Sequence, residues 1–302
     1  MDVFVIGATG FVGGGVAAHL SAAGHRVRGL ARTPAGADQL RIRGVTPVAG
    51  DLGERRKEVL TAASTADAVV YAAQVDPSAE LAVVESLLDA ATGAFVFVSG
   101  TGVFLQRTGG AWSPDCVAED DSFAVEPLAA ARFATEQATR AAAGRGLRAM
   151  VLRPGLVWGP GDHGHVSQVY RSVAATGAAC FVGQGLNSYT HVHLGDIARL
   201  AASVLETGTA GALYHAAAGE VPSRWIAEAV ARDLGCGTRS LTPAEAAQVW
   251  GDFGALVMGA SSRSRDPRTR RELHWSPQHT DLLSTVGEPR LRALASPVPV
   301  PN

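Results

Sequence analysis

The sequence has few cysteines, and no two of them stand at the spacing of a metal or redox motif. Cys116, Cys180 and Cys236 lie far apart, and their number is odd. This usage argues against a disulfide framework or a zinc site and is typical of a protein in a reducing compartment. We therefore expect a cytoplasmic protein.

Long apolar segments and a large excess of charge are also missing. No apolar run approaches the ~20 residues that span a bilayer, and a strand-like run from residue 3 leaves no room for a charged leader. The formal net charge is −2 over 302 residues, so neither nucleic acid nor an anionic membrane is an expected partner. The composition predicts a near-neutral, soluble globular protein.

The first half of the chain alternates short apolar runs with helical segments. This alternation predicts an α/β fold with a parallel, doubly wound sheet of the Rossmann type. We expect a dinucleotide-binding core over residues 1–155 and a smaller substrate-binding region over 156–302, with residues around 189–216 returning to the core. The expected strands cover residues 2–6, 26–31, 45–49, 68–73, 94–99 and 148–154.

A glycine-rich turn follows the first expected strand and opens the first expected helix. Its residues are Gly7-Ala8-Thr9-Gly10-Phe11-Val12-Gly13. Glycines at this spacing let the backbone turn sharply and approach a pyrophosphate, while the helix N-terminus offers unpaired N–H groups to it. The strand-turn-helix context predicts that Gly7, Thr9, Gly10, Phe11, Val12 and Gly13 bind a dinucleotide.

The end of the second expected strand lacks the acidic residue that commonly binds the ribose of NAD. The segment runs Arg28-Gly29-Leu30-Ala31-Arg32-Thr33. The guanidinium of Arg32 suits a 2′-phosphate, so we expect NADP(H) as the cofactor. Arg28 alternates away from the expected face.

Several further motifs, taken in order, resemble the extended short-chain dehydrogenase/reductase family in its NAD-dependent epimerase/dehydratase-like and atypical branches. The resemblance covers nearly the whole chain, and it implies that Asp51 and Leu52 contact the adenine, that Ala72 and Ala73 line the cofactor, and that Pro154 borders it. The motifs are Gly50-Asp51-Leu52, Tyr71-Ala72-Ala73, Ser99-Gly100-Thr101-Gly102-Val103-Phe104, Leu152-Arg153-Pro154-Gly155-Leu156-Val157-Trp158-Gly159-Pro160-Gly161, His193-Leu194-Gly195-Asp196-Ile197-Ala198 and Arg271-Glu272-Leu273-His274-Trp275-Ser276-Pro277.

The catalytic Tyr-x-x-x-Lys pair of that family is absent. None of the four tyrosines has a lysine four residues later, and Lys57 is the single lysine. Leu128 stands at the tyrosine position, Arg132 at the lysine position and Gly100 at the serine position, with Thr101 adjacent. Leucine transfers no proton, whereas the arginine can still hydrogen-bond a ribose. We therefore predict that Arg132 holds the cofactor and that another group supplies any acid.

The candidates for that acid are Thr101, His163, His165 and Tyr170. The last three follow the Arg-Pro-Gly turn, where the resemblance places the substrate pocket, and Asp162 lies among them. A histidine there titrates near neutrality and can donate a proton.

Three other polar groups have simpler interpretations. His191 and His193 share one face of an extended segment, but no third ligand is evident, so no metal is expected. Asp196 is expected to cap a helix over residues 197–205. The acidic run 119–121 and the basic run 263–271 are interpreted as solvated loops.

Three functions remain open. The first is an NADP(H)-dependent reductase of a small carbonyl, enone or imine compound. The second is a non-redox isomerase, epimerase or cyclase on the same fold, and the third is a binding protein that senses the dinucleotide. The resemblance also makes a homodimer plausible.

Overall fold

A parallel sheet of seven strands forms the larger part of the molecule, in the order β10-β6-β5-β4-β1-β2-β3. The computed structural model describes residues 1–161 and 164–296, so Asp162, His163 and residues 297–302 lie outside the described part. All neighbouring strands of the sheet run parallel. The strands are β1 (Asp2–Ile6), β2 (Arg26–Ala31), β3 (Thr46–Ala49), β4 (Ala68–Tyr71), β5 (Ala94–Val98), β6 (Arg148–Pro154) and β10 (Leu213–Ala216).

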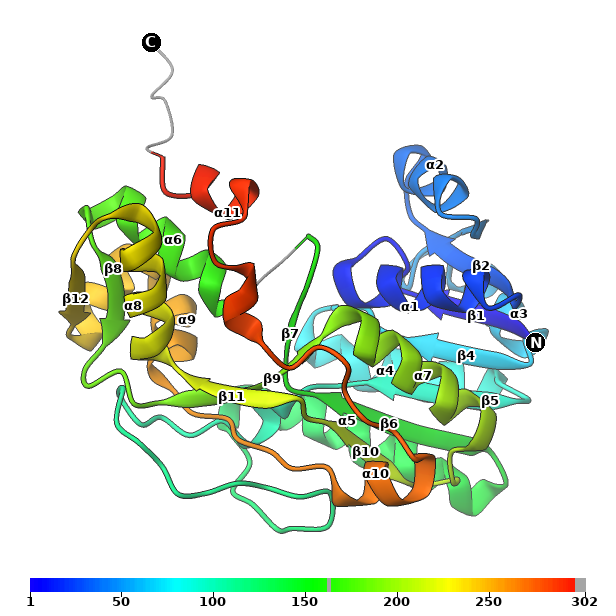
Figure 1. Cartoon of the computed structure of the whole chain (residues 1–302). Coiled ribbons are helices and arrows are strands. Elements are labelled where there is room, and N and C mark those ends of the chain that lie inside the picture. The colour runs from blue at the N-terminus through cyan, green and yellow to red at the C-terminus, as the bar shows by residue number, and fades with distance from the viewer. Residues whose placement is uncertain (162–163, 297–302) are drawn as a thin grey trace.

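Helices cover both faces of this sheet, which explains why its central strands are apolar along their whole length. All residues of β1, β4 and β5 are buried. One face packs against α1 and α7, which lie side by side (Figure 1), and the other packs against α3 and α4. The helices of this part are α1 (Phe11–Ala22), α2 (Pro34–Ile42), α3 (Arg56–Ser64), α4 (Pro77–Ala90), α5 (Ala130–Ala141), α7 (Leu194–Thr207) and α10 (Pro267–Leu273). Short 3₁₀ helices are η1 (Thr101–Phe104), η2 (Pro127–Ala129) and η3 (Ala142–Arg145).

A smaller lobe lies beside the carboxyl ends of these strands (Figure 1). It contains a three-stranded sheet, β11-β9-β7, and a two-stranded sheet, β12-β8. Its own apolar core includes Trp158, Tyr170, Ile226 and Leu291. Its elements are β7 (Leu156–Trp158), α6 (His165–Thr176), β8 (Ala179–Val182), β9 (Ser188–His193), β11 (Gly219–Pro222), α8 (Ser223–Leu234), β12 (Thr238–Leu241), α9 (Pro243–Gly259), η4 (Leu282–Thr285) and α11 (Pro289–Ala293).

The chain reverses the direction in which it adds strands between β1 and β4. From β1 it builds outward through β2 and β3, and from β4 it builds the other way through β5 and β6. A parallel sheet opens a crevice at the carboxyl ends of its strands at such a switch point. The glycine-rich turn, which follows β1, lies at this crevice.

The acidic and basic runs expected to be solvated loops instead pair with each other. Glu119 is buried and accepts hydrogen bonds from the backbone N–H of Thr269 at 3.0 Å and from the Thr269 hydroxyl. Asp120 pairs with Arg268, and Asp121 with Arg265. Part of the basic run forms α10, and these contacts hold it against the loop that contains residues 119–121.

Candidate cofactor and substrate site

The glycine-rich turn between β1 and α1 has no room for a side chain at Gly7 or at Gly13. Gly7 has a φ of +92°, and a Cβ there would lie 2.5 Å from the carbonyl oxygen of Ala72 on the neighbouring strand connection. A Cβ on Gly13 would collide with the carbonyl oxygen of Gly7. The turn is closed by a hydrogen bond from the Gly10 N–H to the Gly7 carbonyl, 2.9 Å long. These contacts bring the start of α1 against the strand ends, as phosphate binding by a helix N-terminus requires.

A cleft of about 750 Å³ opens at this turn. The structure brings together here most of the residues predicted to bind a cofactor, whereas Gly13 packs beneath the turn and neither Arg132 nor Pro154 is part of the lining. The lining comprises Ile6, Gly7, Thr9, Gly10, Phe11, Val12, Leu30, Arg32, Asp51, Leu52, Gly53, Ala72, Ala73, Gln74, Val75, Ala79 and Val83. The size and the open glycine cradle suit a dinucleotide.

Basic side chains surround the end of the cleft beside β2. A second hollow of about 220 Å³ adjoins it and is lined by Arg32, Arg41 and Arg55. Arg41 pairs with Asp38, and Arg55 with Asp51. Within the described part of the chain, the Arg32 guanidinium has no hydrogen-bond partner. At the β2 end of the cleft, Arg32 is therefore the arginine whose N–H donors are available to a ligand.

Asp51 is held in its charged form by the loop that follows it. Its Oδ1 accepts a hydrogen bond of 2.8 Å from the Gly53 N–H, and its Oδ2 accepts one of 3.2 Å from the Arg55 side chain. These bonds, the one from Gly53 above all, lower the pKa of Asp51. Arg28 lies elsewhere: it pairs with Asp2 and donates to the Ala62 carbonyl.

Arg132 is bound from two sides near the end of β5. Its guanidinium pairs with Glu80 at 2.6 Å, donates to the carbonyl oxygen of Val98 at 2.7 Å and lies over the ring of Phe97. Burial raises the pKa of Glu80, and the neighbouring Arg132 opposes that rise. The charge of Arg132 is thus matched within the protein, and its role toward a ribose stays a prediction.

Thr101 and Leu128 stand, respectively, beside and at two further positions where the family has catalytic residues. Thr101 begins η1, three residues after the end of β5, and is buried; its carbonyl oxygen accepts a 2.7 Å hydrogen bond from the Ser262 hydroxyl. Leu128, at the position of the family tyrosine, is 63% exposed. The structure places no ionisable group at that position.

His165 begins α6 and lies in the interior of the smaller lobe. Its ring packs edge-on against Tyr189, with centroids 4.7 Å apart. Burial lowers the pKa of His165 to about 4, so the ring is neutral near pH 7. Its Nε2 is buried and lacks a hydrogen-bond partner in the described part of the chain, as does the Tyr189 hydroxyl. Buried polar atoms are normally paired, so such atoms require an explanation.

Sequence reasoning missed Tyr189. Its alternation with His191 and His193 along β9 was the available signal, because residues two apart in a strand share one face. His163, the neighbouring candidate, lies outside the described residues.

Tyr170 is fully buried in the core of the smaller lobe, and both hydrogen-bonding roles of its hydroxyl are used there. The hydroxyl donates to Asp233 Oδ2 at 2.6 Å and accepts from the Gly287 N–H at 2.9 Å. Burial and the bond to Asp233 raise the pKa of Tyr170 to about 12. These contacts join α6, α8 and the segment before α11, and they give Tyr170 a structural function.

We expect Tyr170→Phe to lower the free energy of unfolding by about 1–2 kcal/mol, because it leaves Asp233 and the Gly287 N–H short of a partner. Tyr189→Phe is the matched control. Its hydroxyl is also buried but bonds to nothing in the described part, so its removal is expected to leave stability unchanged or to raise it. Urea unfolding of both variants measures the difference. Equal effects would contradict the structural function given to Tyr170.

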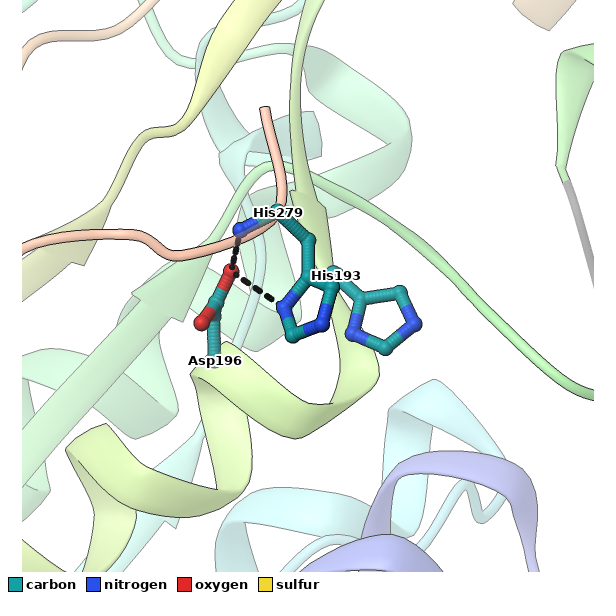
Figure 2. Close-up of side chains that lie close together, drawn as sticks. All are labelled: His193, Asp196 and His279. Atoms are coloured by element: carbon teal, nitrogen blue, oxygen red, sulfur yellow. Dashed lines mark hydrogen bonds and ion pairs between the residues drawn. The ribbon is translucent and has the colours of Figure 1, made fainter. Parts of the chain in front are cut away.

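His193, Asp196 and His279 form a further polar cluster, at the start of α7 (Figure 2). Within residues 1–161 and 164–296, they are close enough together to hold a metal ion. The Asp196 carboxylate, however, already accepts from the backbone N–H groups of Gln278 and His279, from the His279 ring and from Arg199. The lone pairs that would bind a metal are thus engaged in fastening the C-terminal segment.

The helix cap expected at Asp196 belongs to His193 instead. The helix begins at Leu194, and His193 Nδ1 accepts a 3.1 Å hydrogen bond from the Gly195 N–H. Asp196 lies in the first turn and turns toward the C-terminal segment, where the Trp275 indole also donates to its carbonyl oxygen. The expectation was wrong because the sequence does not show that residues 275–279 cross this helix end.

Comparisons with known proteins agree with this geometry. A model of the NAD dependent epimerase/dehydratase family matches residues 3–217. The uncharacterized protein YLL056C of Saccharomyces cerevisiae is 30% identical over 305 residues, covering 95% of this chain and 98% of that protein. The protein C2A9.02 of Schizosaccharomyces pombe, also uncharacterized, is 30% identical over 302 residues, with the same coverage.

Two solved structures show the same fold. The dTDP-glucose 4,6-dehydratase of Bacillus anthracis, in complex with NAD, has a TM-score of 0.76 and 17% identity, covering 97% of this chain and 99% of that one. MoeE5, in complex with UDP-glucose and NAD, has a TM-score of 0.74 and 20% identity, covering 97% and 100%. In the described part of the present chain, no helix is long and apolar enough to cross a membrane.

Proposed function

The chain belongs to the NAD dependent epimerase/dehydratase family, and from this premise we propose that it is an NADP(H)-dependent reductase of a small organic carbonyl, enone or imine compound. The observation that carries the proposal is the cleft at the glycine-rich turn, with the unpaired Arg32 at its β2 end. A dinucleotide fits the cradle, and a 2′-phosphate would meet Arg32 at the mouth of an arginine-lined hollow.

The residues near β5 favour net reduction over reversible oxidation. Epimerisation and dehydration by transient oxidation need a base that first removes a proton from a hydroxyl. Leu128 is no such base, and Arg132 is already matched by Glu80. Reduction of a polarised double bond depends mainly on holding the reacting atoms close and aligned.

The described residues suggest which groups bind the cofactor and which bind the substrate. The glycine-rich turn and Arg32 hold the two ends of the adenosine diphosphate, and the cofactor, when bound, supplies a hydride. Thr101 can donate a hydrogen bond to a carbonyl oxygen. His165, neutral near pH 7, can donate one from its unpaired ring nitrogen. The second half of the reaction takes a proton from water, because Thr101 and the neutral ring of His165 can hydrogen-bond the developing oxyanion but are too weakly acidic near pH 7 to give up a proton to it.

Fluorescence titration of the purified protein with NADPH and NADH tests the first half of the proposal, with tighter binding of NADPH expected. NADPH oxidation in the presence of carbonyl, enone and imine compounds tests the second, with turnover of at least one class expected. A product of unchanged mass, without net use of cofactor, would point to an isomerase. Binding without turnover would point to a dinucleotide sensor, and absence of binding would remove the proposal altogether.

A further inference from the structure

A second cavity, separate from the cofactor cleft, lies in the smaller lobe between α6, the end of α9 and α11. Its volume is about 290 Å³. Among the residues that the structure describes, its lining combines apolar, polar and basic side chains and includes no acidic one. The lining residues are Leu156, Gly161, Gly164, His165, Ser167, Gln168, Arg171, Val257, Arg290 and Leu294.

The positive charges in this cavity form no ion pair with the described residues. Most arginines of the chain form ion pairs, as Arg224 does with Glu228 and Arg292 with Asp233. Arg171 and Arg290, in contrast, have no hydrogen-bond or ion-pair partner within the part of the chain that the structure describes. Two arginines that face one cavity without a carboxylate are a site for an anion, since the guanidinium fork matches carboxylate and phosphate oxygens.

A buried polar atom at the same cavity points to a ligand independently of these charges. His165 is 3% exposed and lines the cavity, and its Nε2 has no partner in the described part of the chain. A buried nitrogen of this kind costs free energy unless something bonds to it. A ligand with a polar group beside its apolar body would satisfy it.

We propose that this cavity holds the substrate of the reductase, and that the substrate is a compact anion whose carboxylate or phosphate pairs with Arg171 and Arg290. The proposal rests on the proposed function for the reaction, but the anion site can be tested without turnover. Leu156, Val257 and Leu294 then enclose the carbon skeleton, and His165 hydrogen-bonds a polar group within it.

The size of the cavity favours a ligand smaller than a nucleotide sugar. A nucleoside diphosphate sugar contains a nucleoside, two phosphates and a hexose, which makes it little smaller than a dinucleotide. The protein provides about 750 Å³ for the dinucleotide but only about 290 Å³ here, at the lower limit of the ~300–1,000 Å³ typical of small-molecule sites. MoeE5, which has a similar fold, is known in complex with UDP-glucose, and the cavity of the present chain argues for a smaller ligand.

The cavity adjoins the cofactor cleft through a single contact layer. Gly161 lines the cavity, and a Cβ at this glycine would touch the ring of Phe11 at 3.5 Å. Phe11 in turn lines the cofactor cleft. A ligand in the cavity would therefore lie near the glycine-rich turn that is expected to hold the cofactor.

Arg290 is placed by a short helix that is anchored on three sides. In α11, Leu291 is fully buried in the core of the lobe, and Arg292 pairs with Asp233. The Gly287 N–H just before the helix donates to Tyr170. These contacts fix the backbone from which Arg290 projects.

The test measures binding and turnover separately on the protein saturated with NADP⁺ or NADPH. Calorimetric titration with 4-oxopentanoate, its methyl ester, dihydroxyacetone phosphate, dihydroxyacetone and UDP-glucose compares matched charged and neutral probes. We expect one of the two charged carbonyl probes to bind at least tenfold more tightly than its neutral partner and than UDP-glucose. The carboxylate and phosphate members of the panel distinguish the two kinds of anion.

The variants Arg171→Gln and Arg290→Gln are each expected to weaken binding of the charged probe about tenfold and to leave the neutral probe unchanged. Arg232→Gln on α8 is the matched control, since Arg232 is also exposed and unpaired in the described part but does not line the cavity. A charged probe that binds no better than its neutral partner, or UDP-glucose that binds best, would overturn the inference. Charge-dependent binding without NADPH oxidation would keep the anion site and remove the reductase.

Discussion

Replacing Glu136 by alanine is expected to lower the free energy of unfolding by about 3–5 kcal/mol, the largest effect of any substitution considered for this protein. Glu136 on α5 and Arg153 on β6 are 0% and 2% exposed, and they form a bidentate ion pair in which Arg153 Nε lies 3.1 Å from Glu136 Oε1. Loss of the carboxylate leaves a guanidinium in the interior without a counter-charge. Its other neighbours are a neutral imidazole and aromatic rings, which cannot replace that charge.

The histidine beside this pair shows that the surroundings are shielded from solvent. His215 Nε2 lies 3.1 Å from an Arg153 nitrogen, and its Nδ1 lies 3.1 Å from the carbonyl oxygen of Arg265. Burial, together with the charge of Arg153, lowers the pKa of His215 to about 3, so the imidazole is neutral. The rings of Phe104 and Phe123 complete the enclosure of the guanidinium.

Urea unfolding of Glu136→Ala measures the loss in free energy of unfolding, and two further variants serve as controls. Glu228→Ala removes the exposed partner of Arg224 and is expected to cost only a few tenths of a kcal/mol, or about 0.3–0.5. The double variant Glu136→Leu/Arg153→Met removes both charges and is expected to recover most of the lost stability. A loss for Glu136→Ala as small as that for Glu228→Ala would show that the buried pair contributes nothing.

The sheet and the turn could be predicted from the sequence because local patterns determine them. Buried parallel strands need largely apolar runs, and the run at residues 2–6 matches β1 in both limits. The expected strands at 26–31 and 148–154 likewise match β2 and β6 in both limits. The glycine-rich turn follows from the same local logic, since its glycines are required where the backbone of Gly7 approaches Ala72. The prediction of a doubly wound α/β fold is confirmed by the sheet order and by the similar solved structures.

The charged contacts could not be predicted, because they join residues far apart in the sequence. Asp120 and Arg268 are separated by 148 positions, and both were expected to be solvated. Asp196 likewise fits a helix cap in sequence, yet it bonds to residues 278 and 279. Charge patterns show which residues need partners, but only the fold decides which partners they find.

The same limit applies to the candidate site. The residues around the cofactor cleft follow the local motifs, whereas Arg171 and Arg290 stand in unremarkable segments and meet only when α6 and α11 pack together. Their lack of ion-pair partners in the described part is visible only when the ion pairs of the folded chain are known. The cavity of the smaller lobe is therefore a property of the tertiary structure.

The second large effect concerns the cofactor. We expect Arg32→Ala to weaken binding of NADPH about 10- to 100-fold and to leave binding of NADH nearly unchanged. A charge-assisted hydrogen bond of arginine to phosphate contributes roughly 1.5–3 kcal/mol, which converts to that range at about 1.4 kcal/mol per factor of ten. Arg32 is the exposed guanidinium at the β2 end of the cleft that has no partner in the described part.

The two neighbouring arginines make this test specific. Arg41 and Arg55 line the adjoining hollow but are paired with Asp38 and Asp51, so their substitution is expected to have a smaller effect on NADPH than that of Arg32. Fluorescence titration of each variant with both cofactors gives the ratio of the two dissociation constants. If Arg32→Ala weakens NADH and NADPH equally, Arg32 contacts a group that both cofactors share, such as the pyrophosphate, and the preference for NADP(H) loses its physical basis. If the ratio changes and the NADH constant does not, the absence of an acid at the end of β2 and the free guanidinium together explain the choice of cofactor.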